Sequence, residues 1–135
     1  MNDSIRRLSR SSIVHVSVAF LLMGGWALYA NRDHSNLRML TAGLVQGTLS
    51  GCLTLFLKSA VEALSARFSG IAALWAPPLI ACIGSAGILV TVHAISGTPE
   101  IAATIAVPLI VSTSYAAVYN YSISRRRMTG NGADR

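Results

Sequence analysis

Four long apolar stretches dominate this sequence and leave little room for any other kind of fold. They run from Ile13 to Ala30, from Met39 to Leu57, from Ile71 to Val92 and from Ile101 to Tyr119. Each is 18 to 22 residues long, and a helix needs about 20 residues to cross the hydrocarbon layer of a membrane. Only 12% of the 135 residues are charged, against about 25% in soluble domains. We therefore predict one domain over residues 1–135, an all-α membrane protein that forms a four-transmembrane-helix bundle with short basic tails.

The distribution of positive charge predicts the orientation of this bundle. With four spans, nine of the eleven Lys and Arg residues fall on the side of the two termini, and only Arg32 and Arg38 fall on the other. Lys and Arg concentrate in short cytoplasmic loops, so we expect cytoplasmic N- and C-termini in a bacterial inner membrane. The basic tails predict contacts with anionic lipid headgroups rather than with nucleic acid.

The second apolar stretch carries two regular patterns that run side by side. Gly43, Gly47 and Gly51 form a doubled GxxxG, a spacing that lets two helices approach closely in a membrane. A polar residue also recurs at every fourth position, and this polar ladder consists of Gln46, Ser50, Thr54, Lys58 and Glu62. Because four residues advance a helix by about 400°, the ladder winds about 160° around the helix from end to end. The glycines predict the packing face of a central helix, within the bundle or within a dimer.

Two interpretations of the polar ladder are open. In the first, Gln46, Ser50 and Thr54 form hydrogen bonds between helices, worth about 0.6 kcal/mol each, and Lys58 and Glu62 form a solvated pair at the membrane boundary. In the second, the same five residues line a polar path, because polar groups inside a membrane are candidates for function. None of the three deep residues is ionisable, which favours the first interpretation.

Ionisable residues gather instead near the ends of the predicted spans. Asp33, His34, His93 and Glu100 form a candidate outer-mouth cluster, since histidine and carboxylate groups can bind a metal or move protons. Their spacing matches no metal-binding pattern, so we predict no metal site. The sequence contains no HExxH, GxSxG, P-loop or GxGxxG motif, which predicts neither an enzyme nor a bound cofactor.

Prolines and glycines mark the third and fourth spans. Pro77 and Pro78 are expected in the first turns of the third span, where a missing backbone donor costs least. Gly84 and Gly87 would permit close approach to a neighbouring helix. Pro108 falls in the middle of the fourth span, where it removes a backbone hydrogen bond and predicts a kink.

These patterns favour a non-enzymatic integral membrane protein that acts through helix packing, as a homo-oligomer or as an accessory subunit of a membrane complex. The alternative is a small transporter, a channel or a flippase of a lipid-linked substrate, with its path along the second span. Residues expected at the cytoplasmic side, among them His15, Lys58 and Glu62, could also hold a lipid phosphate, because basic pockets between spans bind lipid headgroups there. Simple anchoring of these residues at the membrane interface is the favoured interpretation.

Overall fold

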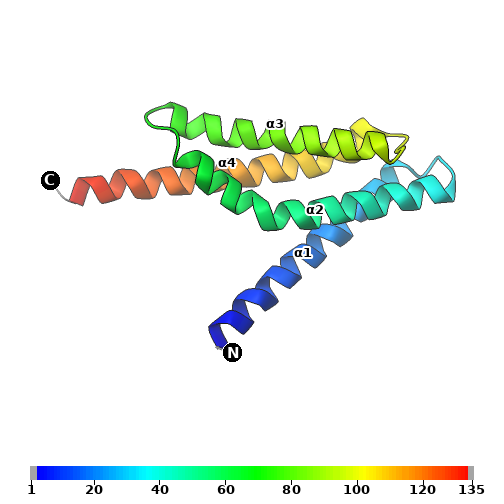
Figure 1. Ribbon diagram of the computed structural model, residues 1–135, viewed down its shortest axis with the longest axis horizontal. Helices are drawn as coiled ribbons and strands as arrows, with labels where there is room; N and C mark the ends of the chain where they lie inside the picture. Colours follow the sequence, from blue (N-terminus) through cyan, green and yellow to red (C-terminus); the bar gives the residue numbers. More distant parts are fainter. Residues whose placement is uncertain (1–2, 134–135) are drawn as a thin grey trace.

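The computed structural model describes the backbone of residues 3–133 and the side chains of residues 12–127. Within that range the chain folds into four helices, α1 (Asp3–Ala30), α2 (Asn36–Ser65), α3 (Ala72–Ile95) and α4 (Ile101–Ala133), joined by short loops (Figure 1). All four helices are long and apolar enough to cross a membrane. The predicted all-α, four-span class is therefore confirmed, whereas the side of the membrane on which the termini lie stays a prediction.

Successive helices run in opposite directions, which gives the bundle two distinct ends (Figure 1). The loops 31–35 and 96–100 lie at one end, which we call the two-loop end. The loop 66–71 lies at the other end. We call this the terminal end, because α1 begins and α4 ends on that side. Helices α2, α3 and α4 lie alongside one another, whereas the N-terminal half of α1 diverges from them. This divergence opens the space described below as the candidate site.

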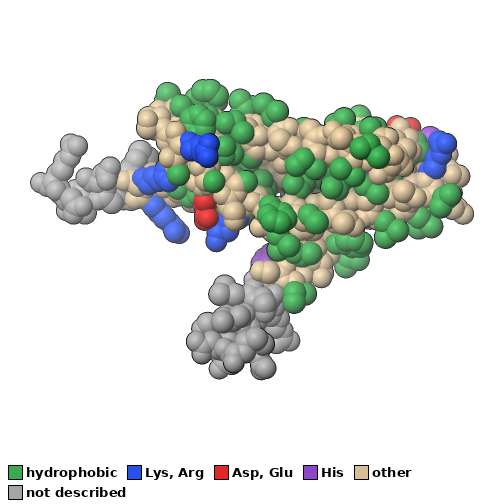
Figure 2. Space-filling model, in the orientation of Figure 1, with side chains coloured by type: hydrophobic (Ala, Val, Ile, Leu, Met, Phe, Trp, Pro, Cys, Tyr) green, Lys and Arg blue, Asp and Glu red, His purple; other side chains and the backbone are tan. Residues whose placement is uncertain are grey.

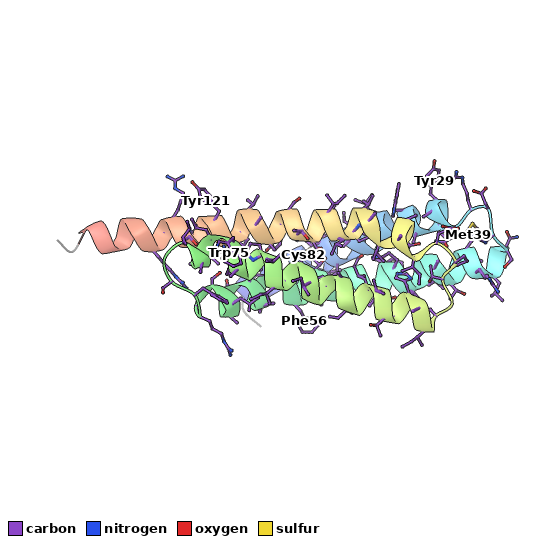
Figure 3. All side chains as sticks on the ribbon, turned by 90° about the horizontal axis from the view of Figure 1, so that it is seen from above. Tyr29, Met39, Phe56, Trp75, Cys82 and Tyr121 are labelled. Carbon is purple, nitrogen blue, oxygen red and sulfur yellow. The ribbon has the colours of Figure 1, made fainter. Side chains whose placement is uncertain are left out.

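On the face shown in Figure 2, most of the coloured side chains between the two charged ends of the bundle are hydrophobic. Leu21 and Phe56, for example, are 68% and 69% exposed. Trp75 and Tyr121 lie at the terminal end and Tyr29 lies at the two-loop end (Figure 3), as expected of aromatic residues at the two membrane–water interfaces. A large apolar surface between two aromatic and charged ends is suited to a lipid bilayer.

Close packing inside the chain occurs along the glycine ridge of α2. A Cβ atom added at Gly47 would lie 2.9 Å from the carbonyl oxygen of Phe20 in α1, and one added at Gly43 would lie 2.6 Å from the side chain of Leu28. Gly24 of α1 approaches equally closely, since its added Cβ would lie 2.9 Å from the carbonyl oxygen of Gly43. The doubled GxxxG is therefore covered by α1 of the same chain.

The glycines of α3 differ from the expectation of close approach. A Cβ added at Gly84 or Gly87 would meet nothing within 4 Å, and both residues are exposed. The reason is the position of α3, which packs on α2 and α4 through another face that contains the buried Ala81 and Ser85. Gly84 and Gly87 lie on the outward face of α3 instead.

The proline pair of α3 is compensated by a side chain from α4. Because α3 begins at Ala72, Pro77 and Pro78 lie beyond the first turn, and each removes the donor that the carbonyl four residues earlier would use. Those carbonyls belong to Ala73 and Leu74. The amide nitrogen of Asn120 donates to both, at 2.8 and 3.0 Å. The expectation that the prolines fall where a donor is dispensable was wrong, and Asn120 replaces the two missing donors.

Helix α4 runs unbroken through Pro108. Pro108 is buried, and the hydroxyl groups of Thr104 and Ser112 donate to the carbonyls of Glu100 and Leu109. The kink at Pro108 stays a prediction.

Candidate functional site: a groove between α1, α2 and α4

The polar ladder of α2 divides into a buried part and an exposed part. Gln46 and Ser50 are buried, whereas Thr54, Lys58 and Glu62 are exposed. This change follows from the winding of an i, i+4 row around the helix, which turns successive residues from the interior toward the surface. The buried part contacts α3 through His93. Thr54 and Lys58 line the groove described below, and Glu62 contacts Tyr119 of α4.

The buried part of the ladder meets His93, which is 0% exposed. Gln46 donates through Nε2 to the hydroxyl of Ser50 at 2.8 Å, and its Oε1 lies 2.8 Å from Nε2 of His93. Because a carbonyl oxygen can only accept, Nε2 of His93 carries the hydrogen in this arrangement. The other ring nitrogen, Nδ1, lies 2.8 Å from the hydroxyl of Thr98. Both ring nitrogens of this buried histidine are thus paired, and the network joins α2, α3 and the loop 96–100.

Replacement of Gln46 by leucine tests this network. We expect Gln46→Leu to lower the free energy of unfolding by about 1–3 kcal/mol, because the buried Nε2–H of His93 loses its acceptor. Adding His93→Leu should recover much of that loss, since removing both partners of a buried hydrogen bond can be nearly neutral. Unfolding by denaturing detergent in mixed micelles would measure the free energy of unfolding of the single and the double variant. Thr48→Leu, on the exposed face of α2, is the control. Equal stability of Gln46→Leu and Thr48→Leu would contradict the network.

The candidate outer-mouth cluster does not converge on one point. Nε2 of His34 lies 3.1 Å from a carboxylate oxygen of Glu100 at the surface, and Asp33 lies 3.8 Å from the exposed Arg32. His93 is inside the bundle. Over the described residues, no three His, Cys, Asp or Glu side chains come together in a way that could hold a metal ion.

Sequence reasoning missed Asn31, which joins the two loops at this end. Asn31 is 0% exposed. Its amide nitrogen donates to the Thr104 hydroxyl at 2.8 Å, and its oxygen accepts from the backbone N–H of Glu100 at 3.0 Å. A polar residue at the end of a span looks like a solvated loop residue in the sequence, so its pairing with a residue 73 positions away left no local signal.

A groove of about 510 Å³ lies where α1 diverges from α2 and α4. Its walls are mostly apolar and include Val18 and Leu22 from α1, Leu53 and Leu57 from α2, and Val111 from α4. Val18, Leu22 and Val111 are 48%, 62% and 51% exposed, so the groove is open to its surroundings at these positions.

The polar residues of the groove are arranged along its length. Ser50 and Thr54 of the ladder lie on its α2 wall, and Lys58 follows one turn nearer the terminal end. His15 from α1 and Tyr115 from α4 line the same part of the groove. One end of this mostly apolar groove therefore carries a cationic side chain and two side chains that can form hydrogen bonds.

This fold and groove define a small four-span integral membrane protein. Comparisons of the chain with protein-family models, with curated proteins and with solved structures give no match.

Proposed function

We propose that this protein binds a lipid that carries a phosphate headgroup, with the hydrocarbon chain of the lipid in the groove between α1, α2 and α4. The observation that carries the proposal is the groove itself, which is apolar along most of its walls and has Lys58 at its terminal end. The volume of about 510 Å³ lies within the range of small-molecule sites, about 300–1,000 Å³.

The membrane location supports a lipid as the occupant. A groove that opens into the hydrocarbon layer is filled by hydrocarbon, because water is scarce there and apolar walls offer it no partners. The terminal end adds a positive charge at Lys58, and basic sites between spans bind the headgroups of anionic lipids. The predicted cytoplasmic termini would place this headgroup in the inner leaflet.

Two other functions receive less support from the geometry. A dimer through the doubled GxxxG would have to displace α1, which covers Gly43 and Gly47. A continuous polar path along α2 would have to pass Gln46, whose amide is 0% exposed and is hydrogen-bonded to His93 and Ser50. Binding, with no chemical conversion and no cofactor, is the function that we propose.

Native mass spectrometry would test the proposal. Protein reconstituted with phosphatidylglycerol and released in a mild detergent should retain one lipid molecule. Val111→Trp fills the groove and should lower lipid occupancy about tenfold, which corresponds to about 1.4 kcal/mol of binding free energy. Val90→Trp is the matched control, because Val90 lies on α3 away from the groove and is 44% exposed. Equal occupancy in the two variants, or no retained lipid in the unmodified protein, would contradict the proposal.

A further inference from the structure

A second, smaller hollow lies near the groove at the terminal end. It has a volume of about 390 Å³ and is lined by Glu62 and Tyr119 together with Ile123, Arg126 and Arg127. Glu62 follows Lys58 of the groove by one turn of α2, and Tyr119 follows Tyr115 by one turn of α4. The rings of the two tyrosines are stacked, with their centres 5.7 Å apart.

The hollow therefore lies one helical turn beyond the groove along α2 and α4. A lipid chain in the groove would leave its headgroup next to Lys58, one turn from the hollow. Figure 2 shows Lys and Arg side chains around an acidic side chain at this end of the molecule. The hollow therefore lies where the headgroup of the proposed lipid would reach.

The hollow combines two kinds of hydrogen-bonding group. Arg126 and Arg127 present guanidinium groups, whose forked donors match phosphate oxygens. The guanidinium of Arg127 also donates to the carbonyl oxygen of Ser65 at 2.7 Å, which holds it against the end of α2. Glu62 supplies a carboxylate that accepts a hydrogen bond from the hydroxyl of Tyr119. Because a carboxylate has about four acceptor positions, it can accept a second donor beside that hydroxyl.

We propose that this hollow selects a headgroup that carries a phosphate and an amine, as in phosphatidylethanolamine, with the phosphate at Arg126 and Arg127 and the ammonium at Glu62. The inference rests on the proposed lipid-binding function and adds the class of headgroup. A headgroup with phosphate alone would bring a second negative charge close to the Glu62 carboxylate, so repulsion would offset part of its attraction to Arg126 and Arg127. An ammonium on the same headgroup turns that repulsion into an ion pair.

The selectivity is measured by competition between lipids with identical chains. Protein reconstituted in an equal mixture of phosphatidylethanolamine, phosphatidylglycerol and phosphatidic acid should retain the amine lipid about two- to fivefold more than the other two, the size expected of one exposed ion pair. Glu62→Gln should remove this preference while total retained lipid stays similar. Arg126→Gln should lower retention of all three lipids, whereas Arg67→Gln, in the loop 66–71 and outside the hollow, should change nothing.

The outcomes separate this inference from the proposed function. Lipid retained without a preference for the amine, or a preference that survives Glu62→Gln in a folded protein, would overturn the headgroup assignment and leave the groove proposal intact. No retained lipid of any kind would overturn both. Soluble phosphoethanolamine, which has no chain, serves as a further probe. It should not displace the lipid at millimolar concentration, and efficient displacement would show that the hollow binds a free phosphate compound instead. Circular dichroism of each variant would establish that it is folded.

Discussion

Leucine at position 47 is expected to force α1 away from α2 and to destabilise the bundle more than leucine at any other glycine of the ridge. The first atom of the new side chain would lie 2.9 Å from the carbonyl oxygen of Phe20 and 3.0 Å from its ring. A backbone carbonyl cannot rotate away as the end of a side chain can. At Gly43 the nearest atoms belong to the side chain of Leu28, which can change rotamer, so the same substitution there should cost less.

The expected size of the Gly47→Leu effect is about 3 kcal/mol or more in the free energy of unfolding, at the upper end of what overpacking costs. Thermal unfolding followed by circular dichroism in detergent would measure it. Gly84→Leu is the matched control, since a side chain there meets nothing within 4 Å and lies on the outward face of α3. If Gly47→Leu and Gly84→Leu unfolded at the same temperature, α1 could not be covering the glycine ridge as the structure has it.

Alanine at position 120 is expected to have a comparably large effect, for a different reason. Asn120 is 0% exposed and uses both hydrogens of its amide on the carbonyls of Ala73 and Leu74. Its oxygen accepts from the hydroxyl of Ser65 at 2.5 Å. The substitution leaves three groups without this partner, and a buried unsatisfied group costs about 1–3 kcal/mol. We expect Asn120→Ala to lower the free energy of unfolding by about 3 kcal/mol or more.

A double-mutant cycle would show whether the proline pair is the cause. Pro77→Ala and Pro78→Ala restore the backbone donors to Ala73 and Leu74, so Asn120→Ala should cost clearly less in that background than in the unmodified protein. Unfolding by denaturing detergent in mixed micelles is again the measurement, with the exposed Asn36→Ala as control. Additive losses would mean that Asn120 does not replace the donors missing from the prolines.

The general plan of the fold could be predicted from local patterns because each rests on spacing along one helix. The length of each apolar stretch predicted four spans, and the structure has four helices in those places. The four-residue spacing of Gly43, Gly47 and Gly51 indicated a packing face, and α1 packs closely against that face. The winding of the polar ladder was also a consequence of helix geometry.

The candidate site could be predicted only in part. Lys58 and Glu62 were named from the ladder, but the groove depends on the divergence of α1 from α2 and α4, which no single helix encodes. The outer-mouth residues are likewise divided between the surface, which holds Asp33, His34 and Glu100, and the interior, which holds His93. This division depends on the positions of α3 and the two loops in the folded bundle.

The sequence alone therefore determined that this chain forms four membrane-spanning helices, and it indicated the glycine face through which one of them packs. Only the tertiary structure decided that α1 covers this face and that His93 pairs with Gln46. It also decided that Asn120 donates to the two carbonyls that Pro77 and Pro78 leave without a backbone donor. The physical reason is that hydrophobic length and helical spacing are properties of neighbouring residues. A hydrogen bond between helices instead depends on which faces meet and at what height, and the packing of the whole bundle sets both.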